Sequence, residues 1–140
     1  MRLLGIDLGS KRIGIAISDA EGWTAHALTV VARHGGLRDL EDIARLVVEH
    51  EVDEVVLGLP LNMDDSEGPA AERTRKFGQR LQAHLGLPLH YCDERLSTFA
   101  AEELLKEAQV KPRKRKQVVD QLAAALILES YINSQNEREP

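Results

Sequence analysis

The chain has 140 residues and a formal net charge of −5, with 43% hydrophobic but only 4% aromatic residues. This length suits one domain with a buried core, and the scarcity of aromatic rings disfavours a surface that stacks single-stranded bases. The single cysteine, Cys92, excludes an internal disulfide, and neither a membrane-spanning run of about 20 apolar residues nor a signal segment is expected. We therefore expect a cytoplasmic protein with a single domain over 1–134 and a frayed polar tail over 135–140.

The chain opens with strands and continues with alternating helices and strands. Apolar strands over 3–10 and 13–18 flank the hairpin-turn residues Gly9–Arg12, and 25–31 is typical of a short edge strand. The later elements follow from apolar periodicity and from start and stop residues. They are a helix over 37–50, a strand over 52–59, a helix from Pro69 to Leu85, a strand over 87–92, a helix from Ser97 or Thr98 to Ala108, and a helix over 117–134.

This order of elements predicts an α/β fold with a mixed sheet. The opening hairpin is antiparallel, whereas strands that alternate with helices lie parallel and are joined by right-handed crossovers. We expect a five-stranded sheet in the order 3-2-1-4-5, with helices on both faces. In that order the carboxyl ends of strands one, four and five share one edge, where open α/β sheets tend to bind ligands.

Three acidic residues in apolar contexts are directed to that edge. Asp7 ends the first strand, Glu94 follows the fifth, and Asp120 shares the apolar face of the last helix with Ala124 and Ile127. Clustered carboxylates raise one another's pKa, and oxygen ligands suit Mg²⁺ or Mn²⁺. Two such ions can stabilise the attacking and the leaving oxygens of phosphodiester hydrolysis. The pattern therefore favours a divalent-metal site.

Each of these acids also has an explanation without a metal. Asp7 could cap its strand and accept hydrogen bonds from turn amides. Glu94 could be an acid favoured at a helix N-terminus, and Asp120 could be the N-cap of a helix that begins later. The convergence of all three on one edge is what favours the metal site.

Several polar residues near these acids are candidates for binding a polynucleotide. They are Lys11, Arg12, Asn62 and Arg95, together with Arg113, Lys114, Arg115 and Lys116 in the basic run 111–116. The first two could equally be a solvated hairpin turn. The basic run could be a solvated linker, and its like charges together with Pro112 predict a mobile segment.

Four ordered motifs resemble the YqgF family of pre-16S ribosomal RNA nucleases, also called Holliday-junction-resolvase-like proteins. They are Leu4–Ala16, Gly58–Asp64 with Ser66–Pro69, Asp93–Thr98, and Asp120 with Ala123, Ala124, Ile127 and Leu128. The resemblance implies a ribonuclease H-like fold, with Asp7, Glu94 and Asp120 as metal-binding acids. The chain departs from the family at Asp65, where glycine is usual. Aspartate tolerates left-handed geometry, so we expect the turn to be kept.

Three functions compete for this sequence. The first is a metal-dependent hydrolase of phosphodiester bonds, acting in 16S ribosomal RNA precursor maturation or, alternatively, as a Holliday-junction or DNA resolvase. Such a nuclease would bind RNA or branched DNA, with pre-ribosomal particles and a second copy of the chain as further partners. The second is an ATP-dependent kinase of the actin and sugar-kinase type, but the chain has room for only one of its two domains. The third is a catalytically idle ribosome-assembly module, which the presence of all three acids weighs against.

Overall fold

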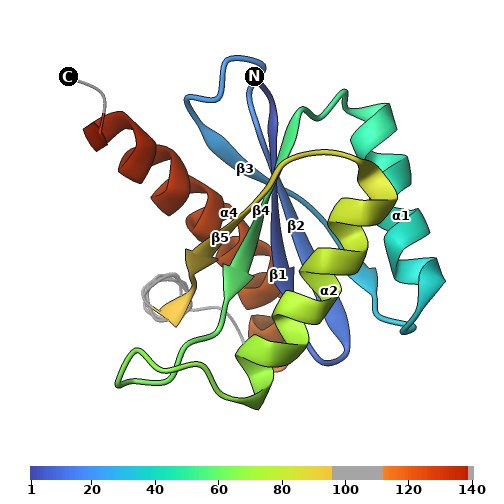
Figure 1. The fold of residues 1–140 in the computed structure, drawn as a ribbon, viewed down its shortest axis with the longest axis vertical. Helices are drawn as coiled ribbons and strands as arrows, with labels where there is room; N and C mark the ends of the chain where they lie inside the picture. Colours follow the sequence, from blue (N-terminus) through green and yellow to red (C-terminus); the bar gives the residue numbers. More distant parts are fainter. Residues whose placement is uncertain (96–111, 139–140) are drawn as a thin grey trace.

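The computed structural model describes residues 1–95 and 112–138, with side chains described for 1–95 and 122–136. The elements in chain order are β1 (Leu3–Leu8), β2 (Arg12–Ser18), β3 (Ala25–Ala32), α1 (Leu37–Glu49), β4 (Glu54–Leu59), α2 (Pro69–Leu85), β5 (Leu89–Asp93) and α4 (Pro112–Arg138) (Figure 1). The helix expected over 97–108 lies outside the described residues. No helix in the described ranges has the length and apolar character of a membrane span.

The strands form one mixed sheet in the order β3-β2-β1-β4-β5, which confirms the predicted order. Neighbours within β3-β2-β1 are antiparallel, and those within β1-β4-β5 are parallel. The turn between β1 and β2 is tight because the Gly9 amide donates to the Arg12 carbonyl oxygen at 2.9 Å. A Cβ on Gly9 would lie 2.6 Å from that same oxygen, so this turn requires glycine.

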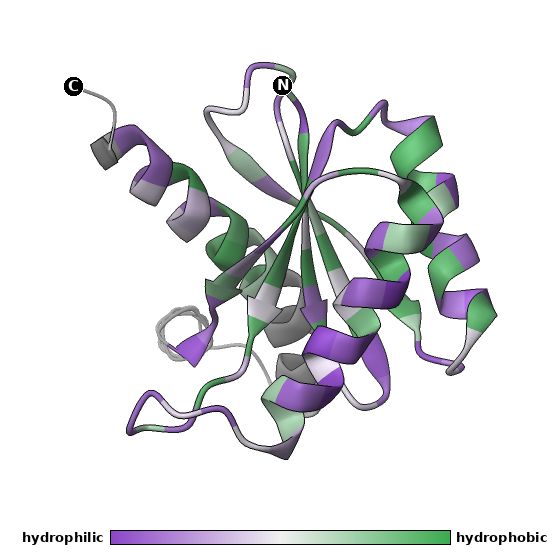
Figure 2. Ribbon diagram, viewed as in Figure 1, coloured by the Kyte–Doolittle hydropathy of each residue, from purple (hydrophilic) through white to green (hydrophobic). Residues whose placement is uncertain are grey.

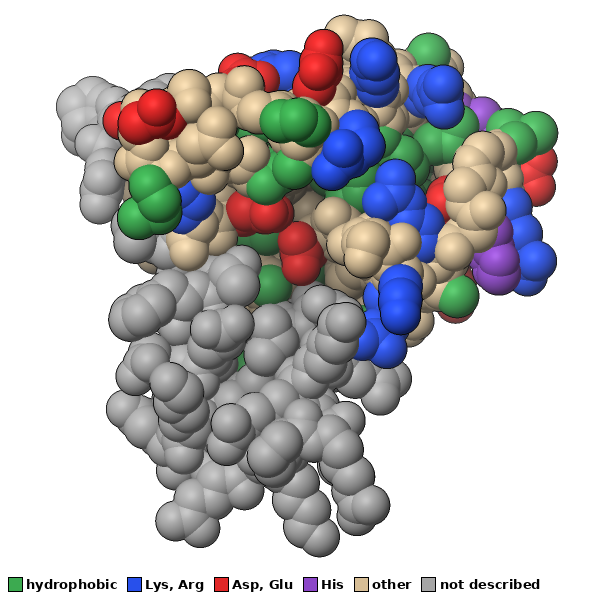
Figure 3. Space-filling view, turned by 90° about the horizontal axis from the view of Figure 1, so that it is seen from below, with side chains coloured by type: hydrophobic (Ala, Val, Ile, Leu, Met, Phe, Trp, Pro, Cys, Tyr) green, Lys and Arg blue, Asp and Glu red, His purple; other side chains and the backbone are tan. Residues whose placement is uncertain are grey.

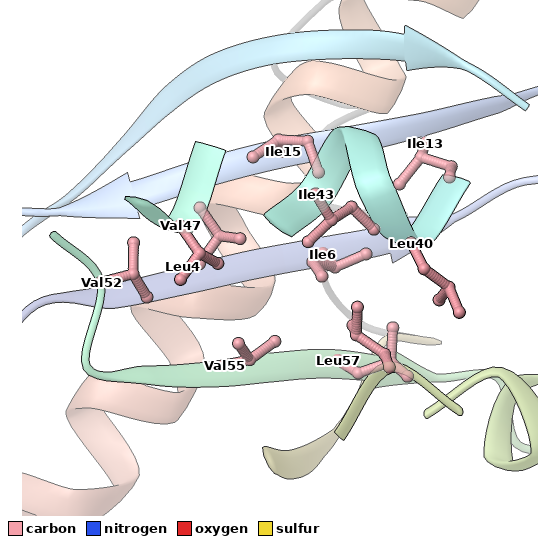
Figure 4. Close-up of a cluster of buried hydrophobic side chains, with 11 residues drawn as sticks. Leu4, Ile6, Ile13, Ile15, Leu40, Ile43, Val47, Val52, Val55 and Leu57 are labelled. Carbon is pink, nitrogen blue, oxygen red and sulfur yellow. The ribbon is translucent and has the colours of Figure 1, made fainter. Parts of the chain in front are cut away.

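Helices cover both faces of the sheet. Side chains alternate between the two faces along β1, so Leu4 and Ile6 point to one face and Leu3 to the other. On the first face, α1 and α2 pack over Leu4, Ile6 and their neighbours in a cluster of buried aliphatic side chains (Figure 4). On the second face, α4 packs over Leu3, with Ile127 among its buried side chains. Figure 2 shows hydrophobic residues along the central strands, and hydrophobic and hydrophilic residues interspersed along the helices.

Small residues allow α4 to lie close to the sheet. A Cβ on Gly5 would be 2.8 Å from the Leu128 Cβ and 3.1 Å from the Ala124 carbonyl oxygen. Ala124 is itself completely buried. Further along, Ile132 packs in the same cluster as Leu3, so α4 runs antiparallel to β1. The start of α4 therefore lies at the carboxyl edge of the sheet (Figure 1).

The bounds of α2 agree with the sequence, but those of α4 do not. Gly86 ends α2 in the left-handed conformation (φ 68°) and donates its amide to the Gln82 carbonyl oxygen. The last helix begins at Pro112 instead of residue 117 and ends at Arg138 instead of residue 134. The prediction of a linker over 111–116 is therefore wrong for 112–116, where the backbone is helical, and Lys111 lies outside the described residues. Proline suits the first position of a helix, and lysine and arginine are good helix formers, so local propensity outweighs charge repulsion.

We predict that Gly5→Ala lowers the free energy of unfolding by roughly 1–3 kcal/mol, because the new methyl group overpacks the contact between β1 and α4. Urea unfolding followed by circular dichroism measures this cost. The same substitution in a Leu128→Gly background should cost less, because the Cβ of Leu128, the nearest overlapping atom, is removed. Equal costs in both backgrounds would show that the helix shifts freely away from the strand.

Candidate active site

The carboxyl ends of β1, β4 and β5 meet at one edge of the sheet, as the predicted topology requires. Ile6 pairs with Leu57 across β1 and β4, and Leu59 pairs with Asp93 across β4 and β5. The chain stays at this edge after β5, because the Glu94 amide donates to the Leu59 carbonyl oxygen at 3.3 Å. Figure 3 looks onto this edge and shows acidic side chains near the middle, with lysine and arginine side chains beside them.

Asp7 and Glu94, which are far apart in the sequence, meet at this edge through a side-chain hydrogen bond. Burial raises the pKa of Glu94 to about 8, and the charge of Asp7, the bond to Asp7 and the charge of Asp93 add to the effect. Two carboxyl groups can hydrogen-bond only if a proton lies between them, so the pair shares one near neutral pH. The structure thus brings two of the three predicted acids together, while their role as metal ligands stays a prediction.

A glycine in β4 makes room for this pair. A Cβ on Gly58 would lie 2.8 Å from Oε2 of Glu94 and 2.6 Å from Cδ1 of Ile127. Any larger residue would therefore displace the carboxylate of Glu94 and the tip of the Ile127 side chain. The sequence contains a signal for this packing, because Gly58 interrupts a run of aliphatic residues in the strand. A glycine within a strand often marks a point where another group lies close to the backbone.

The third predicted acid, Asp120, lies in α4, but its side chain is outside the described residues. Helical periodicity places position 120 on the face that carries Ala124 and Ile127, both fully buried against the sheet. Among the side chains that the structure describes, no group of three or more His, Cys, Asp or Glu is arranged to hold a metal ion. The complete three-acid site therefore stays a prediction.

The donor chemistry of the Asp7–Glu94 pair fits a hard divalent cation. Both residues offer carboxylate oxygens, which are the preferred ligands of Mg²⁺ and Mn²⁺. Burial and the charge of Asp7 raise the pKa of Glu94, so a second negative charge is unfavourable here and a cation would displace the proton of the pair on binding.

Arg95 ties the loop between β4 and α2 to the end of β5. Its guanidinium donates to the Asn62 carbonyl oxygen and to the Asp65 carboxylate, both at 2.7 Å, and to both oxygens of Asp93 at 2.6 to 3.1 Å. The hydrogen bonds that Arg95 donates to Asp93, and then the one to Asp65, raise the pKa of Arg95. The Asn62 side chain donates to Oγ of Ser66 at 3.0 Å. The predicted substrate contacts Asn62 and Arg95 therefore lie near the acids but are bound within the protein.

A further cation, Arg33, supports the β1–β2 turn and was not singled out by the sequence pattern. Its guanidinium donates to the Gly9 carbonyl oxygen at 2.7 Å, and its amide donates to the Lys11 carbonyl oxygen at 2.9 Å. The pairing of Arg12 with Ala32 across β2 and β3 brings it there. The position of Arg33 could have been predicted from the strand order, because that order places the end of the third strand beside the start of the second.

The predicted basic run reaches the same edge at the start of α4. For Arg113, Lys114, Arg115 and Lys116 the structure describes the helical backbone alone, and Lys111 lies outside the described residues. The first turn of α4 carries no acidic residue. The positive end of a helix dipole beside a cationic sequence favours anions, so this helix start suits phosphate groups.

Comparisons with known proteins agree in one family. Residues 1–134 match the family model RuvX, described as Holliday junction resolvase. A protein of Moorella thermoacetica is 49% identical over 133 residues, which cover 95% of each chain. One of Listeria monocytogenes is 45% identical over 138 residues, which cover 97% of this chain and 100% of the relative. Both relatives carry the name "Putative pre-16S rRNA nuclease".

Solved structures share the fold at low sequence identity. RuvC of Thermus thermophilus in complex with a Holliday junction substrate has a TM-score of 0.61 and 14% identity, covering 99% of this chain and 97% of that one. The fowlpox virus Holliday junction resolvase has a TM-score of 0.57 and 15% identity, covering 96% and 99%. These likenesses confirm the ribonuclease H-like fold.

We predict that the metal-free protein loses stability as the pH rises through the interval between 4.5, the usual pKa of a glutamate, and about 8. In that interval the folded state holds a proton on Glu94 that the unfolded state has released, so the free energy of unfolding falls with rising pH. Glu94→Gln cannot ionise, and at about pH 8.5 it should be more stable than the wild type by roughly 1–3 kcal/mol.

Urea unfolding in the presence of a chelator, at about pH 5.5 and about pH 8.5, measures this difference. The matched control is Glu41→Gln, which removes an exposed acid on α1 and should leave the pH dependence unchanged. A wild type and a Glu94→Gln variant with the same pH dependence would contradict the shared proton.

Proposed function

The chain belongs to the RuvX family, and from this we propose that it is a nuclease that hydrolyses phosphodiester bonds with the help of divalent metal ions. The observation that carries the proposal is the half-buried, hydrogen-bonded Asp7–Glu94 pair at the carboxyl edge of the sheet. Carboxylates with strongly perturbed pKa values cluster at functional sites. The names of the relatives favour the 16S ribosomal RNA precursor as the substrate, which implies a cytoplasmic protein that meets pre-ribosomal particles.

Asp7, Glu94 and Asp120 would hold Mg²⁺ or Mn²⁺ at this edge. When bound, such ions supply charge stabilisation for the attacking and the leaving oxygens of a phosphodiester. The support for Asp7 and Glu94 is their contact and shared proton. The support for Asp120 is its helical spacing from Ala124 and Ile127, which pack on the sheet, and the start of α4 at the same edge.

The cations of the edge would bind and orient the polynucleotide backbone. Lys11 and Arg12 lie in a turn that Gly9 makes tight and Arg33 braces, next to Asp7 at the end of β1. The basic start of α4 would supply a second set of phosphate contacts. Because the whole chain has a net charge of −5, these local cations, and no general excess of positive charge, would draw the substrate to the acids.

We predict that replacing Asp7, Glu94 or Asp120 singly by the corresponding amide lowers the cleavage rate in Mg²⁺ or Mn²⁺ by about 100-fold or more, with the fold retained. Each replacement removes one of the charges that would hold the ions. Cleavage is measured on a panel of 16S precursor RNA, single-stranded DNA and four-way DNA junctions. Asp42→Asn on α1 is the control acid. Full activity of the Asp7→Asn variant would contradict the proposed site.

The same panel separates two candidate substrates. Ribosomal RNA precursor is favoured by the names of the relatives, whereas a Holliday junction is favoured by the description of the family model. Cutting of four-way junctions alone would assign the resolvase function, for which a homodimer would bring two sites to the paired strands. Binding without any cleavage would instead indicate a catalytically idle module.

We predict that changing Arg113, Lys114, Arg115 and Lys116 together to glutamine flattens the slope of log affinity against log salt by up to about 3 units for single strands. Each lost phosphate contact removes about 0.7 from that slope. Binding is measured by fluorescence anisotropy across a salt series, in an Asp7→Asn background that does not cut. The exposed Arg45 of α1 provides a control in Arg45→Gln. Unchanged slopes would show that the start of α4 faces away from the substrate.

A further inference from the structure

Arg95 has three kinds of acceptor, and they differ in where they lie. Asp93 is two residues away along the chain and binds the guanidinium through both oxygens, and it also accepts the Arg95 amide at 3.1 Å. The Asn62 carbonyl oxygen is a neutral backbone acceptor in the β4–α2 loop. Among the described residues, Asp65 in the same loop is the one acidic residue outside β5 whose side chain accepts a hydrogen bond from Arg95.

Of the three acceptors of Arg95, Asp65 is the one that another anion can replace. The Asp65 side chain is 81% exposed, whereas the Arg95 side chain is 24% exposed, so water reaches the carboxylate freely. Exposed ion pairs of this kind contribute little to stability. Asp65 also has a left-handed backbone (φ 71°), a conformation that aspartate tolerates better than most residues but less well than glycine. The Asp93 contact, in contrast, is local in the chain and bidentate, so it would persist if the loop moved.

A phosphate group could take the place of Asp65. Arginine binds phosphate and carboxylate with the same planar pattern of N–H donors. Arg95 directly follows Glu94, so a phosphate bound to it would lie close to the acidic pair at the edge of the sheet. Nη2 of Arg95 also donates to Asp93, so one N–H of this nitrogen is open to exchange. As long as Asp65 accepts from that N–H, the donor is taken and a second negative charge stands beside it.

We propose that Asp65 is a positioning residue that sets the affinity for nucleic acid by occupying Arg95 until a substrate phosphate displaces it. The inference rests on the proposed function, since it takes a polynucleotide as the competing anion. In the unliganded protein the contact keeps the loop against β5. On binding, the substrate must replace one carboxylate, and this lowers the affinity for polyanions that make few other contacts.

The test compares Asp65→Asn and Asp65→Gly in an Asp7→Asn background, with binding to single-stranded RNA and DNA oligonucleotides followed by anisotropy over a salt series. Both variants remove the charge, but only Asp65→Gly also relieves the left-handed backbone. We expect both to bind about two- to fivefold more tightly, which corresponds to the loss of one exposed ion pair. The slope of log affinity against log salt should steepen by up to about 0.7, because one more cation meets a phosphate.

The matched control is Glu67→Gln, which breaks another exposed carboxylate–arginine pair of the same loop. Its partner Arg75 lies over the ring of Tyr91, 4.7 Å from the ring centroid, and so stays in place when Glu67 is neutralised. This variant changes the net charge of the protein as Asp65→Asn does, but it should leave the salt slope unchanged. Circular dichroism and thermal melting confirm that every variant is folded.

Each other outcome overturns the proposal. Equal gains in the Glu67→Gln control would show a general charge effect, and a gain in Asp65→Gly alone would assign the effect to loop flexibility. Unchanged binding in both Asp65 variants, with clear binding by the Asp7→Asn background, would contradict the role of Asp65 but not the nuclease function. No binding of any oligonucleotide by that background would contradict the proposed function and the inference together.

Discussion

Two positions in the sheet that lack a side chain set the geometry on which the candidate site depends. Gly5 in β1 lets α4 lie against the strands, and Gly58 in β4 leaves space for the carboxylate of Glu94 and the tip of Ile127. With a Cβ at either position, heavy atoms would approach to less than 3 Å, so the helix or the carboxylate would have to move. Close packing of this kind is rigid, which suits a site whose acidic groups must hold their places.

The arrangement that close packing creates is electrostatically unfavourable in the absence of a ligand. Burial and the neighbouring acids Asp7 and Asp93 raise the pKa of Glu94 to about 8, so the pair at the edge keeps a proton that isolated carboxyl groups would release. Active sites commonly carry such a cost, because charges gathered for a ligand repel one another without it. The burial of aliphatic side chains on both faces of the sheet stabilises the fold and offsets this electrostatic cost.

Hydrogen bonds within the protein fix the positions of two arginines near the acids. Arg33 braces the β1–β2 turn through the carbonyl oxygens of Gly9 and Lys11, and Arg95 joins the β4–α2 loop to β5. Both arginines donate to backbone oxygens of another segment, so Arg33 helps to order the β1–β2 turn and Arg95 the β4–α2 loop. A substrate phosphate would meet an edge whose loops are already in position, which reduces the entropy lost on binding.

The sequence by itself determined the sheet order and much of the outline of the site. Alternating strands and helices allow few topologies, Pro69 and Gly86 mark the ends of α2, and Asp7 and Glu94 follow from the strand ends. The tertiary structure decided what depends on neighbours: the helical backbone of the basic run, the contact of Asp65 with Arg95, the position of Arg33 and the raised pKa of Glu94. Periodicity records which side of an element is buried, but a pairing between distant side chains depends on strand register and on atomic contact, which no local pattern contains.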